Sequence, residues 1–306
     1  MFGPDITFLG VDRCDLDDPA SFAGADVVIV GAPFDGGTSY RSGARFGPQA
    51  MRSACYLAHD GSRPSLAMRV DGLQDMRVVD AGDVELYSGD AVRSCADLEV
   101  VIEKIASSGA IPLVLGGDHT ITWPDVTGVA RARGWGKVSV IHFDAHSDLW
   151  QDDDMSRIDH GTFFYKAVKT GLIDPKTSVQ IGIRTACDDY LGVEYIDART
   201  VHERGCAYAV ARAKEIVGNR PTYVTFDIDC LDPSAAPGTG TPVWGGLHSW
   251  QAAACLRDLA GINMVGGDVV EVSPPFDPSG VTAHAGVTMM FEILCPMAED
   301  VAKCRK

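Results

Sequence analysis

The sequence lacks the features that mark secreted, membrane-spanning and disulfide-stabilised proteins. Its nine cysteines are scattered and include no CxxC pair, so we predict neither a zinc knuckle nor a disulfide framework. No apolar run approaches the roughly 18 residues that a membrane span requires. The charged residues among the first 18 are acidic except for one Arg, which is the reverse of a signal peptide's basic start. We therefore expect a soluble cytoplasmic protein that has no membrane partner and keeps its thiols reduced and mostly buried.

Basic residues are also scarce. Lys and Arg number 26 against 42 Asp and Glu, which gives a formal net charge of −16. Nucleic-acid binding needs a basic face toward the phosphates, so this balance disfavours a nucleic-acid partner. An acidic surface attracts small cationic molecules, although the same charge also serves solubility alone.

No proline-rich linker, charge block or internal repeat divides the sequence, and we expect one domain over residues 1–306. Amphipathic stretches at 90–107, 200–217 and 249–260 predict helices between short apolar runs. Thr200 and Ser249 are the expected N-caps, and Gly218 is the expected stop of the second helix. Most of these runs are continuous, which is typical of strands covered on both faces. The alternation predicts an α/β fold with a mainly parallel sheet between helices. The predicted strands are 26–31, 76–79, 111–115, 138–143, 178–183, 222–226 and 264–272.

Two groups of acidic residues directly follow predicted strands, where ligands bind in open parallel sheets. Asp144, His146 and Asp148 stand at positions i, i+2 and i+4, so an extended chain places them on one face. Asp227 and Asp229 share a face in the same way. Like charges held together are costly unless a cation joins them, and the alternative is a solvated, Asp-rich turn in each case.

Two further strand ends carry single candidates. His119 follows the glycine pair at 116–117, which allows a tight turn that presents the imidazole at the sheet edge. Taken alone this signal is weak, because a single histidine after a strand is more often a structural residue. Glu271 lies in apolar surroundings, where a buried carboxylate requires a cation or a structural ion pair.

Taken together, the candidate ligands are oxygen-rich with some nitrogen, which suits Mn²⁺ better than zinc. Six residues exceed the needs of one ion. If Asp144 and Asp227 bridge, each of two ions receives four protein ligands, and ions about 3.5–4 Å apart would lower the pKa of a shared water. The predicted ligands are His119, Asp144, His146, Asp148, Asp227 and Asp229.

The combination of motifs resembles the ureohydrolase family, which includes arginases and agmatinases. The motifs are GGDHT at 116–120, DAHSD at 144–148, HGTFFY at 160–165, FDIDCLDPSAAPGTGTP at 226–242 and EVSP at 271–274. The segment at 31–52 also looks like the family's N-terminal signature, so the likeness covers nearly the whole chain.

The resemblance implies a three-layer α/β/α sandwich with an eight-stranded, mostly parallel sheet. It implies two Mn²⁺ per subunit on the six ligands, and hydrolysis of a guanidino group to urea and an amine. In that scheme Glu271 holds the guanidinium, Asp148 takes and passes on a proton, and His160 contacts the substrate or relays a proton. A homo-oligomer, trimer or hexamer, is also implied.

Within the family the agmatinase-like branch fits best, on the stretches 160–185 and 230–242. Arginases carry Asn and Thr/Ser between DAHxD and HG to hold a carboxylate, whereas this loop contains three successive acids at 152–154. Such acids, Asp153 among them, would repel a carboxylate and attract the terminal ammonium of agmatine. The alternative is a solvent-facing loop remote from the substrate. In the final helical region, His284 is expected in the core or at an interface.

Other functions remain open at this stage. The same chemistry could act on 4-guanidinobutanoate, 3-guanidinopropionate or guanidine. A non-catalytic subunit of the same fold is a different class, but such proteins usually lose ligands, and here all six are present. A deacetylase would use a single zinc with fewer acids, so the paired carboxylates argue against it.

Overall fold

A computed structural model describes residues 6–54, 65–87 and 89–304 of the chain. A nine-stranded sheet runs through its centre, and every pairing between its strands is parallel. The strand order is β1-β3-β2-β4-β9-β8-β5-β6-β7. The strands are β1 (Asp12–Arg13), β2 (Val27–Gly31), β3 (Val78–Asp83), β4 (Ile111–Leu115), β5 (Ser139–Phe143), β6 (Val179–Ile183), β7 (Glu194–Asp197), β8 (Thr222–Asp227) and β9 (Met264–Val270).

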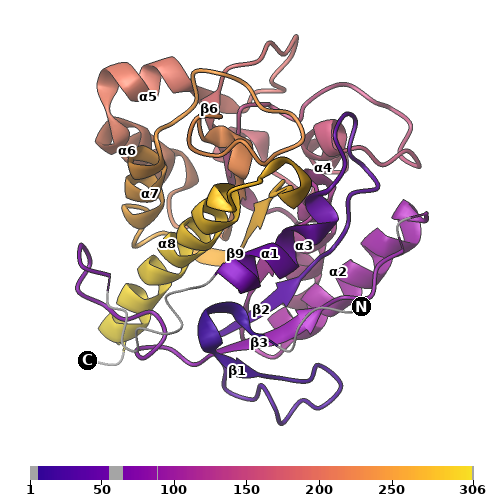
Figure 1. The fold of residues 1–306 in the computed structure, drawn as a ribbon, viewed down its shortest axis with the longest axis vertical. Helices are drawn as coiled ribbons and strands as arrows, with labels where there is room; N and C mark the ends of the chain where they lie inside the picture. Colours follow the sequence, from indigo (N-terminus) through magenta and orange to yellow (C-terminus); the bar gives the residue numbers. More distant parts are fainter. Residues whose placement is uncertain (1–5, 55–64, 88, 305–306) are drawn as a thin grey trace.

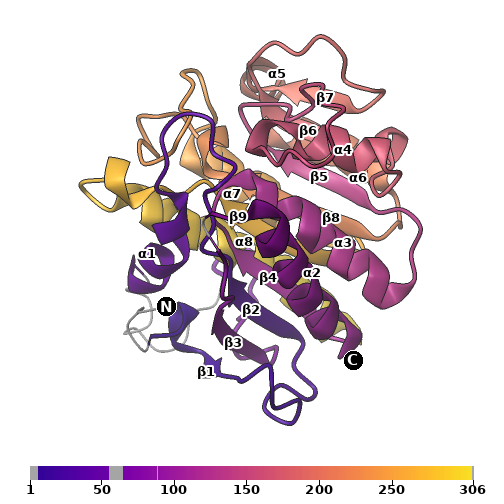
Figure 2. The same ribbon diagram turned by 90° about the vertical axis from the view of Figure 1, so that its right-hand side faces the viewer.

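Helices cover both faces of this sheet, as Figures 1 and 2 show. Helices α2 and α3 pack on one face, and α1, α6, α7 and α8 pack on the other. The helices are α1 (Gly47–Ala54), α2 (Ala91–Ser107), α3 (Thr122–Arg133), α4 (Phe163–Lys169), α5 (Ala198–Arg204), α6 (Cys206–Val217), α7 (Ser249–Arg257) and α8 (Val281–Cys304). The molecule is thus the expected three-layer α/β/α sandwich.

Strand β2 shows why the strands are continuously apolar. Val27 and Ile29 belong to the hydrophobic core beneath α1, α7 and α8, whereas Val28 and Val30 belong to the core beneath α2 and α3. All four side chains are buried. Successive residues of a strand point to opposite faces, so a sheet covered on both sides needs apolar residues at every position.

All seven predicted strands are present, but the expected total of eight is wrong because the sheet has nine. The two strands that the sequence did not show are β1 and β7, which form the outer edges. Strand β1 has only two residues, both exposed, and β7 has a single buried residue, Ile196. An edge strand buries too little to leave a hydrophobic pattern.

The predicted helix at 200–217 is two helices, α5 and α6, separated at Gly205, whose φ is +85°. Asp197 rather than Thr200 caps α5, since its side chain accepts the backbone N–H of Thr200 at 2.6 Å. His248 rather than Ser249 is the N-cap of α7. Of the helix ends predicted at Thr200, Ser249 and Gly218, only the stop at Gly218 is confirmed.

Among the described residues, α8 is the one helix long and apolar enough to cross a membrane. Its stretch Val281–Val301 has a mean hydropathy of 1.3, but 72% of the tested window is buried inside the fold. Met290, Ile293 and Leu294 of this helix lie in the core beneath the sheet. Burial against the sheet therefore accounts for its apolar character, as in the core helix of a globular protein.

Candidate metal centre

The sheet order brings the predicted ligands together. Strands β4, β9, β8 and β5 are consecutive neighbours, and all four end at the same edge because they are parallel. His119 lies in the 3-10 turn after β4, Glu271 follows β9, Asp227 ends β8, and Asp144 follows β5. Residues up to 152 positions apart in the chain thus meet at one edge, where parallel sheets bind ligands.

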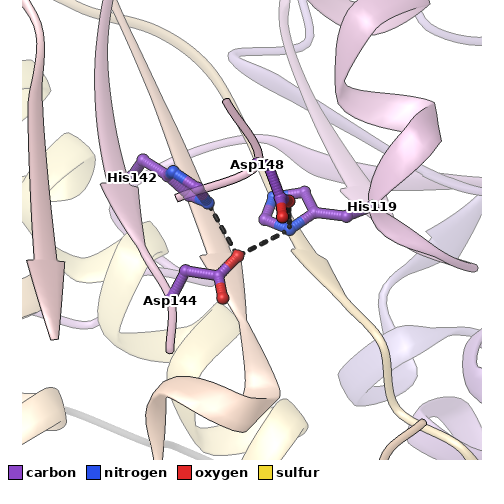
Figure 3. Close-up of side chains that lie close together, drawn as sticks. All are labelled: His119, His142, Asp144 and Asp148. Carbon is purple, nitrogen blue, oxygen red and sulfur yellow. Dashed lines mark hydrogen bonds and ion pairs between the residues drawn. The ribbon is translucent and has the colours of Figure 1, made fainter. Parts of the chain in front are cut away.

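Three carboxylates surround the imidazole of His119. Its Nδ1 lies 3.0 Å from Asp144 Oδ2, 3.2 Å from Asp148 Oδ2 and 3.2 Å from Asp227 Oδ2. All four side chains are buried. Figure 3 shows the His119 imidazole beside the carboxylates of Asp144 and Asp148.

A second group shares Asp144. His146 Nδ1 lies 3.4 Å from Asp144 Oδ1 and 3.1 Å from Asp229 Oδ2. Asp229 Oδ1 accepts the backbone N–H of Ala145 at 3.1 Å, which ties the loop after β8 to the loop after β5. The two groups therefore meet at one carboxylate whose two oxygens face different histidines, as a residue bridging two cations requires.

Asp227 joins the groups through its own two oxygens. Oδ2 faces His119, while Oδ1 accepts the backbone N–H of Asp229 at 2.7 Å. The structure thus brings all six predicted ligands into one cluster, and the assignment of each to a particular ion stays a prediction.

The electrostatics of the cluster favour a bound cation. Burial and repulsion from Asp229 and Asp144 raise the pKa of Asp227 well above its usual value. Burial and Asp144 raise the pKa of Asp148 in the same way. Burial also opposes ionisation of Asp144, but contacts with His142 and His119 hold its pKa well below the ordinary range. Buried carboxylates that repel each other this strongly need protons or cations between them.

The donor set fits two divalent cations. Carboxylate oxygens suit hard ions, and the imidazole nitrogens admit a transition metal such as Mn²⁺. Within the described residues there are two groups in which all ligand atoms lie within 4.8 Å of one another. One group contains His119, Asp144 and Asp148, and the other contains Asp144, His146 and Asp229. Both groups are at the predicted site, so its chemistry matches a binuclear centre.

His142, which the sequence did not suggest, also contacts the cluster. Its Nε2 lies 2.8 Å from Asp144 Oδ2 (Figure 3). Its Nδ1 lies 3.0 Å from the side-chain nitrogen of Gln180. Burial lowers the pKa of His142 to about 4, so the ring is neutral. Because Gln180 donates to Nδ1, the proton is on Nε2 and points at Asp144. His142 therefore orients the shared carboxylate, as partners of metal ligands commonly do.

Glu271 and His160 stand beside the cluster. Glu271 Oε1 accepts the backbone N–H of His119 at 2.9 Å and lies 2.8 Å from His160 Nδ1. Its other oxygen, Oε2, is buried and has no hydrogen-bond partner among the described residues. Glu271 and Asp148 have φ values of +62° and +51°, a region that non-glycine residues seldom adopt. Such backbone strain clusters at functional sites, where the surrounding structure holds it in place.

Asp153 does not join the site. Its side chain is exposed, accepts the hydroxyl of Tyr165 at 2.5 Å, and is absent from the residues that line the cavity beside the metal ligands. Buried Lys166 on α4 fixes the loop that contains Asp153 in this position. Its Nζ donates to the carbonyls of Asp154 and Arg157 and holds them against the helix. The expectation that Asp153 contacts the substrate is therefore not supported by this arrangement.

Comparison with known proteins agrees with this geometry. The family model described as the arginase family matches residues 25–295. A protein named agmatinase from Chromobacterium violaceum is 47% identical over 276 residues, which cover 90% of this chain and 84% of that protein.

Solved structures show the same likeness over nearly the full length. A hypothetical agmatinase from Burkholderia thailandensis superposes with a TM-score of 0.91 at 45% identity, covering 98% of this chain and 93% of that one. Proclavaminate amidino hydrolase from Streptomyces clavuligerus superposes with a TM-score of 0.87 at 38% identity, covering 97% and 98%.

Proposed function

The chain belongs to the arginase family and is a hydrolase of guanidino groups, and we propose that it converts agmatine to putrescine and urea. The observation that carries the proposal is the buried, unpartnered Oε2 of Glu271 beside the two ligand groups. A planar guanidinium offers the paired N–H donors and the positive charge that this carboxylate needs.

The relatives support agmatine in particular. The curated relatives at 46–49% identity are named agmatinases, and each alignment covers 84% or more of the relative. Agmatine is a small cation, in keeping with the net charge of −16. Another amidino compound is the second candidate, because the 38% identical relative is named for proclavaminate.

Glu271 fixes the substrate in this mechanism. Its Oε1 is held by His119 and His160, so Oε2 is presented in one orientation. A guanidinium paired with Oε2 places its carbon beside the ligand groups, and this positioning removes much of the entropic barrier. Two divalent cations, when bound there, supply activation of a water molecule and stabilisation of negative charge on oxygen.

Protons are handled by Asp148 and His160, which both line the cavity. Asp148 is buried at the ligand groups, where it can accept the proton released by the attacking water. Burial opposes protonation of His160, but the Glu271 carboxylate raises its pKa above the ordinary value. The backbone N–H of Ser39 donates to His160 Nε2 at 3.1 Å, so Nε2 is an acceptor and the ring proton is on Nδ1, facing Glu271. Its Nε2 lies 2.7 Å from Ser39 Oγ, which offers a path for a proton toward the leaving amine.

Manganese, the number of subunits and the cytoplasmic location belong to the same proposal. The mixed carboxylate and imidazole donors support Mn²⁺ over Zn²⁺. Metal-depleted protein reloaded with Mn²⁺ should release urea, and sedimentation of the same sample should give a trimer or hexamer.

The substrate is tested by steady-state urea release with Mn²⁺ on agmatine, arginine, 4-guanidinobutanoate, 3-guanidinopropionate and guanidine. We expect agmatine to have the highest kcat/KM. A carboxylated substrate in first place would replace agmatine in the proposal and leave the reaction class intact.

A further inference from the structure

Trp150 forms a wall of the substrate cavity. It follows the predicted ligand Asp148 by two residues, and it lines the narrow cavity that His146 and His160 also line. On its other side it lines a second hollow, of about 160 Å³, together with Tyr165 and other residues of the neighbouring loops. The side chain is 45% exposed, so one edge of the ring faces solvent.

The position of the indole is set by close packing against Gly161. A Cβ at Gly161 would lie 2.4 Å from Cε3 and 2.6 Å from Cζ3 of Trp150, so only glycine leaves room for the ring. The backbone N–H of Trp150 donates to the Gly161 carbonyl at 3.3 Å. The ring also stands edge-on to His146, with 6.2 Å between the ring centroids. The glycine of the HGTFFY segment is therefore required for this position of the Trp150 ring.

The size of the cavity makes this wall a substrate contact. The space beside His146, Asp148 and His160 is about 20 Å³, enough for roughly one water molecule. A guanidino group held beside His146, Asp148 and His160 would fill this space, so the four-carbon chain of the substrate must leave the cavity past a wall residue. Trp150 is the one large aromatic residue among the described residues that line it.

We propose that Trp150 is a specificity-determining residue, whose indole packs on the methylene chain and favours a distal cation over a carboxylate. This inference rests on the proposed guanidino substrate and goes beyond it by naming the residue that recognises the end of the substrate opposite its guanidino group. An indole offers apolar area to methylene groups, and the negative face of its π system attracts an ammonium and repels a carboxylate.

The test compares agmatine with butylguanidine, which has the same chain without the ammonium, in Trp150→Leu and Trp150→Phe. Leucine keeps apolar bulk but removes the π face, so the ratio of kcat/KM for agmatine over butylguanidine should fall roughly three- to thirtyfold, the range of one cation–π contact. Phenylalanine should retain most of the ratio. The matched control is Trp250→Leu, because Trp250 is 65% exposed and does not line the cavity.

Gly161→Ala provides an independent arm, since its methyl group displaces the indole and leaves the indole's chemistry unchanged. It should lower the same ratio. Metal content should match wild type in every variant, which separates a specificity effect from loss of the centre. A wild-type ratio in Trp150→Leu would overturn the inference, as would an equal fall in Trp250→Leu.

Failure of the proposed function gives a different result. If wild-type protein releases no urea from either compound, the proposed reaction is wrong, and calorimetric binding of the same two compounds becomes the readout. Trp150→Leu should then weaken agmatine binding more than butylguanidine binding. Equal affinities in wild type and Trp150→Leu would overturn the role of Trp150 in that case as well.

Discussion

Glu271 holds His160 with one oxygen and keeps the other free: Oε1 lies 2.8 Å from His160 Nδ1, and Oε2 has no hydrogen-bond partner in the described part of the chain. The two functions of this carboxylate, orienting an imidazole and offering a free acceptor beside the ligand groups, are thus divided between its two oxygens. Its position directly after β9, at φ +62°, is what turns it toward the ligands.

Glu271→Gln preserves the shape of the side chain and removes its charge. We expect kcat/KM for agmatine to fall about 100-fold, because the lost charge-assisted pair is worth about 3 kcal/mol. Metal content should stay at the wild-type value, since Glu271 is outside both ligand groups. Steady-state urea assays and elemental analysis measure the two quantities. Glu203→Gln, an exposed change on α5, is the control, and equal kcat/KM in both variants would remove the assigned role.

Gly117→Ala tests the tight turn that precedes His119. A Cβ at Gly117 would lie 1.8 Å from the carbonyl oxygen of Phe34, which is backbone and cannot swing aside. We expect a loss of about 1–3 kcal/mol in the free energy of unfolding, as for overpacked sites. Urea unfolding measures it, with Gly136→Ala as the control because nothing lies within 4 Å of that Cβ. Equal midpoints for the two variants would show that the turn can relax.

Arg52→Met tests the buried ion pair that joins α1 to β3. Arg52 Nε and Nη2 each lie 2.9 Å from an oxygen of Asp80, which is fully buried, and Nη1 contacts Asp83. Removing the guanidinium leaves the Asp80 charge without its partner, so we expect a loss of about 3–5 kcal/mol. The same unfolding assay should show an unchanged midpoint for Arg199→Met, whose pair with Glu203 is exposed. A small effect at Arg52 would contradict this role and would mean that the backbone N–H groups of Phe8 and Gly82 suffice to hold the Asp80 charge.

The thiol of Cys206 should react at lower pH than an ordinary cysteine. The neighbouring thiol of Cys255 lowers the pKa to about 7, against the opposing effects of partial burial and of the contact between Cys206 Sγ and the Gln251 carbonyl at 3.5 Å. The thiolate is the nucleophile and forms above the pKa, so alkylation of Cys206 by iodoacetamide should reach half its maximal rate near pH 7.

Cys255→Ala removes that neighbouring thiol and keeps the contact between Cys206 and the Gln251 carbonyl. The half-maximal pH for Cys206 should then rise toward the ordinary thiol value near 8.5. Peptide mass spectrometry over a pH series resolves the rate at this one site. An unshifted profile in Cys255→Ala would mean that the helix N-terminus, not the neighbouring thiol, sets the reactivity.

Much of the site was predictable from the sequence because its residues directly follow strands with continuous apolar patterns. Asp144 and Asp227 are examples, since parallel strands end at one edge and bring such residues together. Some neighbouring strands in the sheet, such as β4 and β9 or β5 and β8, are far apart in sequence, so the order that places β9 between β4 and β8 required the structure.

Other parts depend on contacts that no local pattern encodes. His142 orients Asp144 only because Gln180 of β6 fixes its tautomer. Asp153 lies away from the cavity because buried Lys166 holds the loop by its carbonyl groups. His284 was expected in the core or an interface; it is exposed, so the core interpretation is wrong and the interface stays a prediction.

The most direct test of the binuclear centre is metal stoichiometry in wild type and Asp229→Asn. After depletion and reloading with Mn²⁺, elemental analysis should give two ions per wild-type chain and about one per variant chain, because Asp229 contacts His146 and lies in only one ligand group. Urea release from agmatine should be nearly lost in the variant. A single ion in active wild-type protein, or full activity in Asp229→Asn, would contradict the account.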